Sequence, residues 1–236
     1  MKKILAIGNS FSQDATALIE LMTEKIYVRN LYIGGCSLER HCENTASDAS
    51  AYEYQAGGER QDLQNVSVSE ALARESWDFV TVQQVSGFSG LEASYEPYLS
   101  ELLKYIRKFT SATVLFHRTW AYETGSGHPD FSRYGNDRKQ MWESIKKTTD
   151  SVCGREKLRI IDTGEMIARL RNHAFFDVER GGISLNRDGF HLSLNYGRAA
   201  AAGVWIKFFT GEIPAFFQRE DLSEGYRIIR EELKNF

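Results

Sequence analysis

The sequence predicts a single α/β domain, a three-layer α/β/α sandwich built on a five-stranded parallel sheet. Two observations lead to this fold class. Short apolar runs rich in β-branched residues alternate along the chain with amphipathic stretches, which is the pattern of strands joined by helical crossovers. The chain also has 236 residues, 42% of them hydrophobic and 26% charged, which is enough for one substantial core.

Five apolar segments are expected to form the strands. In chain order they are Lys3–Gly8, Tyr27–Ile33, Asp78–Gln83, Thr113–His117 and Leu158–Asp162. Helices are expected where apolar residues recur at three- and four-residue spacing. These segments are Asp14–Lys25, Ser69–Glu75, Tyr95–Phe109, Arg138–Val152, Asn195–Phe209 and Glu220–Lys234.

Two polar segments are predicted to be long loops. Glu123–Asn136, which follows the fourth strand, is rich in Gly, Ser, Asp and aromatic residues, and Phe176–Gly189 is expected to be a second such loop. Open α/β sheets bind ligands beyond the carboxyl ends of their strands. We therefore expect the Glu123–Asn136 loop to form part of a pocket wall and to influence the choice of substrate.

Composition indicates a small-molecule substrate. The formal net charge is −3, from 29 Lys and Arg against 32 Asp and Glu, and no charge run suggests a nucleic-acid or lipid partner. Cys36, Cys42 and Cys153 are an odd number without zinc-ligand spacing, so neither a disulfide framework nor a metal site is expected. The first apolar run, Ile4–Ile7, is too short for a signal peptide or membrane span, so we expect a cytoplasmic protein of undetermined oligomeric state.

A candidate nucleophile follows the first strand. In the segment Ile7–Ser12, the Ser10 hydroxyl is expected at the sheet edge, close to backbone N–H groups and the positive end of a helix. Gly8 permits the tight turn that directs Ser10 outward. Serine is also a common helix cap at such a junction, and that is the more frequent use when Ser10 is considered alone.

A candidate base and acid lie far along the chain. Asp188 and His191 are three residues apart, so both side chains can project from one turn. A carboxylate at Asp188 could accept the imidazole Nδ1–H and leave Nε2 free to take a proton from a serine hydroxyl. The structural alternative is an aspartate helix cap followed by a histidine.

Taken together, Gly8-Asn9-Ser10-Phe11 and Asp188-Gly189-Phe190-His191 resemble two motifs of the SGNH-hydrolase (GDSL-like) superfamily of esterases. The resemblance spans residues 3 to about 206 and is to a little-characterised bacterial branch of the superfamily. It implies a flavodoxin-like sandwich and a Ser10–His191–Asp188 triad that needs no cofactor or metal. Asn9 departs from the family pattern, which usually has Asp before the serine. If Asp188 points away from His191, Asp162 is the fallback acid.

The same resemblance implies an oxyanion hole from two further blocks. Gly35 is our candidate for a backbone N–H donor, with Gly34 as the alternative, because glycine allows close backbone approach. Where the family usually carries Gly-x-Asn-Asp, this chain has a pair of glutamines. Gln84 is assigned as the side-chain donor and Gln83 as its competitor, since only one of two adjacent strand residues should face the site. The structural alternative is a glutamine pair that merely solvates the strand end.

Several side chains near the fourth strand are candidates for substrate binding. Trp120 and Tyr122 offer flat faces on which a sugar ring could stack, and His117 could line the pocket. The structural alternatives are that the two aromatic rings belong to the core and that His117 is only a hydrogen-bonded histidine at the strand end. His41, together with Glu39, is a further candidate for substrate contact.

His128 and His173 are expected at ordinary surface positions. The function implied by the resemblance is hydrolysis of a small acyl ester, with an acetylated sugar as the example. The alternative function is non-catalytic binding of a glycan or other ligand on the same fold.

Overall fold

The computed structural model describes all residues from 1 to 236 and contains one seven-stranded sheet. The strands are β1 Lys2–Gly8, β2 Ile26–Tyr32, β3 Glu53–Ala56, β4 Glu59–Arg60, β5 Phe79–Val82, β6 Thr113–Arg118 and β7 Arg159–Asp162, in the order β4-β3-β2-β1-β5-β6-β7. The five predicted parallel strands are confirmed as β2, β1, β5, β6 and β7.

The prediction of exactly five strands is wrong, because an antiparallel hairpin of β3 and β4 extends the sheet beyond β2. These strands have only four and two residues, and their sequences, Glu-Tyr-Gln-Ala and Glu-Arg, lack an apolar run. Periodicity cannot identify strands of this length.

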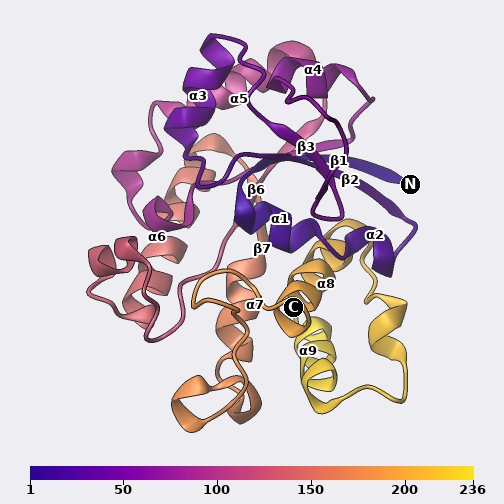
Figure 1. Ribbon diagram of the computed structural model, residues 1–236, viewed down its shortest axis with the longest axis vertical. Helices are drawn as coiled ribbons and strands as arrows, with labels where there is room; N and C mark the ends of the chain where they lie inside the picture. Colours follow the sequence, from indigo (N-terminus) through magenta and orange to yellow (C-terminus); the bar gives the residue numbers. More distant parts are fainter.

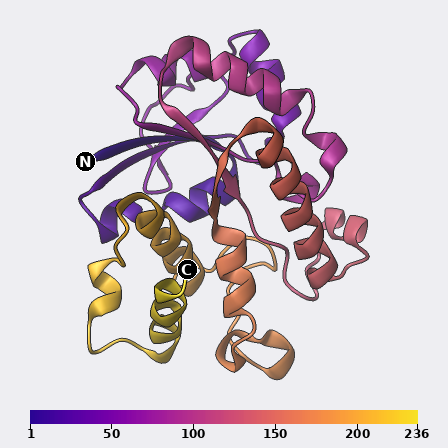
Figure 2. The same cartoon turned by 180° about the vertical axis from the view of Figure 1, so that it is seen from behind.

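Nine α-helices cover the sheet, and the three-layer arrangement is confirmed (Figures 1 and 2). One face carries α3 (Leu38–Ala46), α4 (Val68–Ala73) and α5 (Tyr98–Phe109), which pack against one another. The other face carries α1 (Ser10–Thr16), α2 (Ile19–Met22), α7 (Thr163–Leu170), α8 (Tyr196–Thr210) and α9 (Glu224–Lys234). Helix α6 (Arg138–Glu156) follows β6 and its loop and contributes side chains to the cores on both faces. No helix is both long enough and apolar enough to cross a membrane.

Alternating burial along β1 explains why both faces are covered. Ile4 and Ala6 belong to the core beneath α1 and α8, whereas Leu5 and Ile7 belong to the core beneath α3 and α5. Successive strand side chains point to opposite faces, so a strand that is apolar at every position must be covered on both sides.

The strand order also places the site. β1 lies between β2 and β5, with Gly8 opposite Tyr32 and Ile7 opposite Val82. The segments that leave the carboxyl ends of these three strands therefore emerge side by side at one edge of the sheet. They carry Ser10, the Gly34–Gly35 turn and the segment that follows Val82.

Candidate active site

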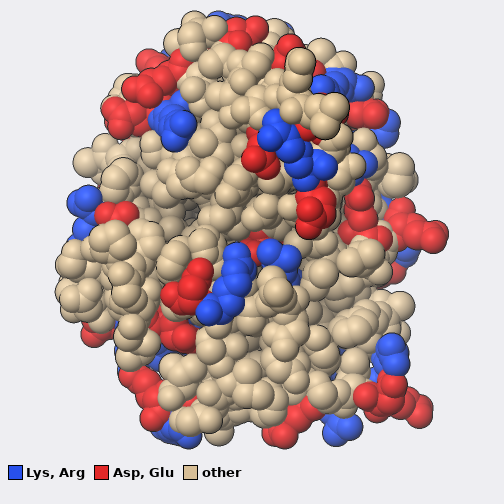
Figure 3. Space-filling model, in the orientation of Figure 1, with Lys and Arg blue, Asp and Glu red and all other residues tan.

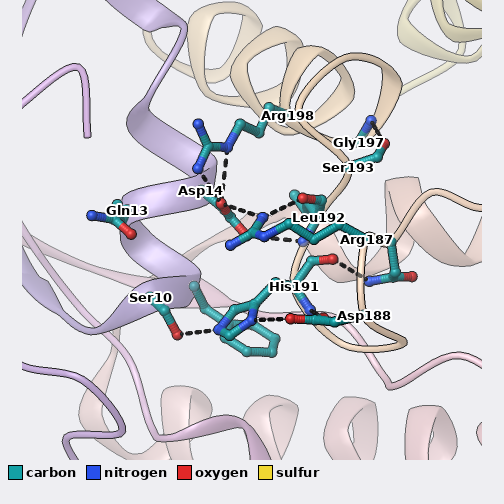
Figure 4. A network of polar contacts seen from close by, with 12 residues as sticks. Ser10, Gln13, Asp14, Arg187, Asp188, His191, Leu192, Ser193, Gly197 and Arg198 are labelled. Atoms are coloured by element: carbon teal, nitrogen blue, oxygen red, sulfur yellow. Dashed lines mark hydrogen bonds and ion pairs between the residues drawn. The ribbon is translucent and has the colours of Figure 1, made fainter. Parts of the chain in front are cut away.

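The turn after β1 presents Ser10 as the first residue of α1. Asn9 is the N-cap residue, and its Oδ1 accepts a hydrogen bond from the Phe11 N–H at 3.0 Å. A side chain at Gly8 would bring its Cβ to 2.5 Å from the Ser12 Oγ, so this close approach requires glycine. The Ser10 hydroxyl lies 2.8 Å from His191 Nε2 (Figure 4).

The imidazole is held by the predicted carboxylate. His191 Nδ1 lies 2.6 Å from Asp188 Oδ2, and Asp188 Oδ1 accepts the backbone N–H groups of His191 at 2.7 Å and Phe190 at 3.2 Å. Burial favours a higher pKa for Asp188, but the hydrogen bonds from His191 and Phe190 outweigh it and lower the pKa. Asp188 is therefore ionised at neutral pH and can orient the Nδ1–H tautomer, which leaves Nε2 to accept the Ser10 proton.

Asp162, the fallback acid, has other partners. Its Oδ2 accepts from Arg118 Nη1 at 2.6 Å, and its Oδ1 caps α7 through the Glu165 N–H at 3.0 Å. The structure thus brings together Ser10, His191 and Asp188 in a hydrogen-bonded chain, and it leaves Asp162 outside it.

The turn that carries His191 is braced by residues that sequence reasoning missed. Asn186 Nδ2 donates to the carbonyl oxygens of Phe190 at 3.0 Å and His191 at 3.2 Å. The Asn186 Oδ1 in turn accepts from Arg171 Nη2 at 2.6 Å, and the Trp120 indole N–H donates to the Phe190 carbonyl at 2.7 Å. No motif marks Asn186 or Arg171, because Arg171 meets the Asn186 side chain and the Ala121 carbonyl only through the tertiary fold, 15 and 50 residues away in the sequence.

A buried ion-pair network ties α1 to the same turn. Asp14 is completely buried and accepts hydrogen bonds from Arg187 Nη1 at 2.9 and 3.0 Å, from Arg198 Nε at 2.9 Å, and from the Leu192 N–H at 2.8 Å (Figure 4). Asp14 lies four residues after Ser10, one turn along the helix. The network therefore connects the helix of the serine to the loop of the histidine. Asp14 is the only charged residue of α1, and nothing else in the sequence marks the network.

A cavity of about 340 Å³ opens over Ser10 and His191. Its wall consists of Asn9, Ser10, Phe11, Gln13, Tyr32, Gly34, Gly35, Val85, Ser86, His128, Arg187, Phe190 and His191. Figure 3 shows that this face of the molecule is hollowed and that no extended patch of one charge surrounds the hollow. Because His128 belongs to the Glu123–Asn136 loop, the expected contribution of that loop to a pocket wall is confirmed.

Unpaired backbone donors lie around this cavity. The N–H groups of Ser10, Gly34, Gly35 and Ser86 donate to no acceptor in the protein, and all four residues line the cavity. Gly35 has a φ of +62°, a conformation that favours glycine. Unpaired N–H groups beside a nucleophile are the components of an oxyanion hole.

The predicted position of the Gln84 amide is wrong. Gln84 Nε2 donates to the Ser94 carbonyl at 2.8 Å and to its hydroxyl at 3.0 Å, while Oε1 accepts the Leu38 and Val85 N–H groups at 3.0 and 2.8 Å. All four hydrogen bonds join Gln84 to other parts of the protein, so its amide is not free to bind a ligand. Gln84 also does not line the cavity. The glutamine pair is therefore a structural element, because backbone groups of three loops need these partners.

Gln83, the alternative side-chain donor to the oxyanion hole, does not line the cavity either. Gln83 Nε2 donates to Asn9 Oδ1 at 2.8 Å, and its Oε1 lies 2.8 Å from His117 Nδ1. Asn9 Nδ2 also donates to the Cys36 carbonyl at 3.0 Å. The departures from the family pattern at Asn9 and Gln83 thus form one buried network that joins the ends of β1, β2 and β5.

Gln84→Ala is expected to affect stability more than turnover. Removing the amide leaves the Leu38 and Val85 N–H groups unpaired, which should lower the free energy of unfolding by about 1–3 kcal/mol. The esterase activity implied by the resemblance should stay within about fivefold of wild type in the folded variant, against the much larger loss typical of an oxyanion donor. Urea denaturation and ester hydrolysis measure the two effects, and a loss of kcat at unchanged stability would contradict this assignment.

The three predicted substrate-binding residues do not reach the cavity. Trp120 and Tyr122 are fully buried, Trp120 stacks on Phe11 with ring centroids 4.4 Å apart, and the Tyr122 hydroxyl bonds to Ser86 at 2.9 Å. His117 is also buried, and its Nε2 lies 3.0 Å from the Thr163 hydroxyl. The prediction of direct sugar stacking is wrong because these rings form the core that supports the site.

The remaining histidine predictions have mixed outcomes. His41 is buried and bonds to the Tyr52 hydroxyl at 2.8 Å, and Glu39 accepts from Tyr98, so neither contacts the cavity. His128, expected at an ordinary surface position, lines the cavity instead. His173 is partly exposed and pairs with Glu232 of α9 at 2.7 Å.

Comparisons with known proteins agree with this architecture. A family model described as a domain of unknown function, DUF4886, matches residues 3–220. The crystal structure of a DUF4886 family protein from Bacteroides uniformis is 35% identical to this chain, with a TM-score of 0.87, and the match covers 99% of this chain and 93% of that one. No curated protein sequence matches.

More distant structures share the fold. A protein assigned as an SGNH hydrolase from Slackia heliotrinireducens is 19% identical, with a TM-score of 0.63 over 88% of this chain and 98% of that one. A catalytic mutant of an acetylxylan esterase from Geobacillus stearothermophilus is 12% identical, with a TM-score of 0.58 over 89% of this chain and 95% of that one. From its sequence match and its three-layer architecture, the chain belongs to the DUF4886 family and has the fold of the SGNH hydrolases.

Proposed function

We propose that the protein is a serine esterase that hydrolyses a small acyl ester, with acetate esters as the first class to test. The observation that carries the proposal is the Asp188–His191–Ser10 hydrogen-bonded chain, with bonds of 2.6 and 2.8 Å, at the floor of an open cavity. A nucleophile within hydrogen-bond reach of a base, which is itself oriented by a third group, is the arrangement that acyl transfer requires.

The proposed reaction has two halves. His191 Nε2 takes the Ser10 proton as Oγ attacks the ester carbonyl, and the proton then passes to the departing alcohol as the C–O bond breaks. Water then attacks the acyl-enzyme while His191 Nε2 accepts its proton, and that proton passes to Ser10 Oγ as the bond between the acyl carbon and Oγ breaks. The carboxylic acid is released and the Ser10 hydroxyl is restored. The negative oxygen of each tetrahedral intermediate is stabilised by the N–H groups of Ser10 and Gly35.

The Ser86 N–H is our replacement for the glutamine amide as third donor. It is unpaired and comes from the segment that follows β5, the position where the resemblance implies a side-chain donor. An N–H dipole from the backbone stabilises an oxyanion as an amide side chain does. The missing glutamine therefore does not remove the third donor from the site.

Identity of the alcohol is a separate matter. The fold similarity to an acetylxylan esterase supports acetylated sugars as a substrate class, whereas the burial of Trp120 and Tyr122 removes the aromatic platform expected for a sugar ring. We accordingly propose the ester chemistry first and treat the sugar as one class in the substrate screen.

Labelling with a fluorophosphonate probe tests the function directly, since such probes react with an activated serine. Wild type should be labelled and should hydrolyse p-nitrophenyl acetate, and Ser10→Ala should do neither. Ser12→Ala is a matched control, because the Ser12 hydroxyl is buried against Asn9 and Asn30 rather than His191. Binding of ligands without labelling or turnover would favour the non-catalytic binding protein.

A further inference from the structure

Arg187 presents a free guanidinium edge to the cavity above the serine. Its Nη1 donates to both Asp14 oxygens and to the Leu192 carbonyl, whereas its Nε and Nη2 have no acceptor in the protein. The side chain is 33% exposed and lines the cavity together with Ser10 and His191. Figure 4 shows Arg187 reaching from the loop before Asp188 across to α1, above the His191 ring.

The positive charge of Arg187 is not needed to neutralise Asp14. Arg198 already meets that carboxylate through Nε at 2.9 Å and Nη2 at 2.8 Å. Two guanidinium groups and one carboxylate leave one net positive charge in the network. Arg187 has no other ion-pair partner, and no Asp or Glu side chain lines the cavity. The cavity therefore has an uncompensated cation in its wall.

A second unpaired donor belongs to the lining of the same cavity. The Tyr32 hydroxyl makes no hydrogen bond within the protein, and it would lie 3.3 Å from a Cβ placed on Gly34. Burial, then the charges of Glu53 and Asp14, raise the pKa of Tyr32, so the phenol keeps its proton at neutral pH. The same wall thus offers guanidinium N–H and phenol O–H donors, which an anionic group with several acceptor oxygens would satisfy.

We propose that the ester hydrolysed at this site carries a carboxylate on its alcohol part, and that the free edge of Arg187 binds it while Ser10 faces the acyl carbonyl. This inference rests on the proposed esterase function and adds the substrate class. Guanidinium groups pair with carboxylates through two parallel hydrogen bonds, which fix orientation as well as position. A carboxylate bound there would place the ester in one orientation over the nucleophile.

Two substrates that differ only in charge test the proposal. 3-Acetoxybenzoate carries a carboxylate, and 3-acetoxybenzamide replaces it with a neutral group of nearly the same shape. After correction for their rates of hydroxide-catalysed hydrolysis, wild type should prefer the acid by about 10- to 100-fold in kcat/KM, a typical gain for a charge-assisted pair. The preference should also fall as ionic strength rises, because the pair is partly exposed to solvent.

Arg187→Gln separates recognition from support of the loop. Gln can still donate to Asp14, and the expected result is that the acid-to-amide ratio in kcat/KM falls from about 10–100 to near one, mainly through a higher KM for the acid, the pattern of lost substrate binding. Arg198→Gln is the matched control, since it weakens the same Asp14 network and should leave the ratio unchanged. Arg187→Lys, which keeps the charge but not the fork, should retain part of the preference.

The outcomes distinguish the inference from the function on which it rests. Equal rates on the two substrates in an active wild-type enzyme would overturn the carboxylate proposal and leave the esterase intact. Equal losses on both substrates in Arg187→Gln would show that Arg187 only positions the loop. If Arg187→Gln does not fold, the salt dependence of the wild-type preference decides the matter. Wild type that hydrolyses neither these acetates nor p-nitrophenyl acetate would instead refute the esterase function.

Discussion

Ser10→Ala and His191→Ala are each expected to lower kcat for ester hydrolysis by about 10⁴–10⁶, while the double variant is little worse than either. The reason is that the two side chains perform one step. Without His191 the Ser10 hydroxyl stays protonated and weakly nucleophilic, and without Ser10 the imidazole has no proton to accept at 2.8 Å.

Steady-state kinetics with p-nitrophenyl acetate measure this non-additivity. The thermal midpoints of the single variants should stay within a few degrees of wild type, since Ser10 and His191 lie at the cavity rather than in the core. Losses that multiply in the double variant would mean that the two residues act independently. Residual activity well above the uncatalysed rate would be attributed to the N–H donors alone.

Asp188→Asn is expected to lower kcat by about 10²–10⁴ with the fold retained. An asparagine still accepts the backbone N–H groups of Phe190 and His191 through its oxygen, so the turn should form. Its amide nitrogen, however, would face His191 Nδ1 where the carboxylate stands at 2.6 Å, and this favours the tautomer with the proton on Nε2. That tautomer cannot accept the serine proton.

Asp162→Asn is the matched control for this substitution. Asp162 pairs with Arg118 and caps α7, so its loss should change the thermal midpoint but leave kcat within a few-fold. Near-wild-type turnover in Asp188→Asn combined with a large loss in Asp162→Asn would reverse the assignment of the acid. Circular dichroism of both variants excludes a trivial loss of fold.

Elements with a strong local pattern could be predicted from the sequence. The five parallel strands are apolar runs long enough to show β character, and α5 has Leu99, Leu102, Leu103 and Ile106 on one face. The helix expected over Asp14–Lys25 is instead divided into α1 and α2, with α1 beginning at Ser10. The helices α3 and α7 are missing from the prediction.

The candidate site divides in the same way. Ser10 and the Asp188–His191 pair could be found because each lies in a short contiguous motif, and a three-residue spacing already places an aspartate beside a histidine. Gln84, Trp120 and Tyr122 were misassigned, because sequence position puts them near the site but does not say which way they point. Each of the three is buried and bonded or packed within the protein.

The sequence by itself therefore determined the layered α/β class and the central parallel strands, since both depend on local periodicity. It indicated the three residues of the proposed triad through the spacing of Asp188 and His191 and through the resemblance of two short segments to SGNH-hydrolase motifs. Only the tertiary structure decided which N–H groups stay unpaired and which side chains line the cavity. The tertiary structure alone also brings Arg187 and Arg198 into hydrogen bonds with Asp14, which lies more than 170 residues earlier in the chain. The physical reason is that hydrogen bonding and charge pairing depend on contacts between segments that are distant in the sequence. A donor stays unpaired only if no acceptor from another segment packs against it.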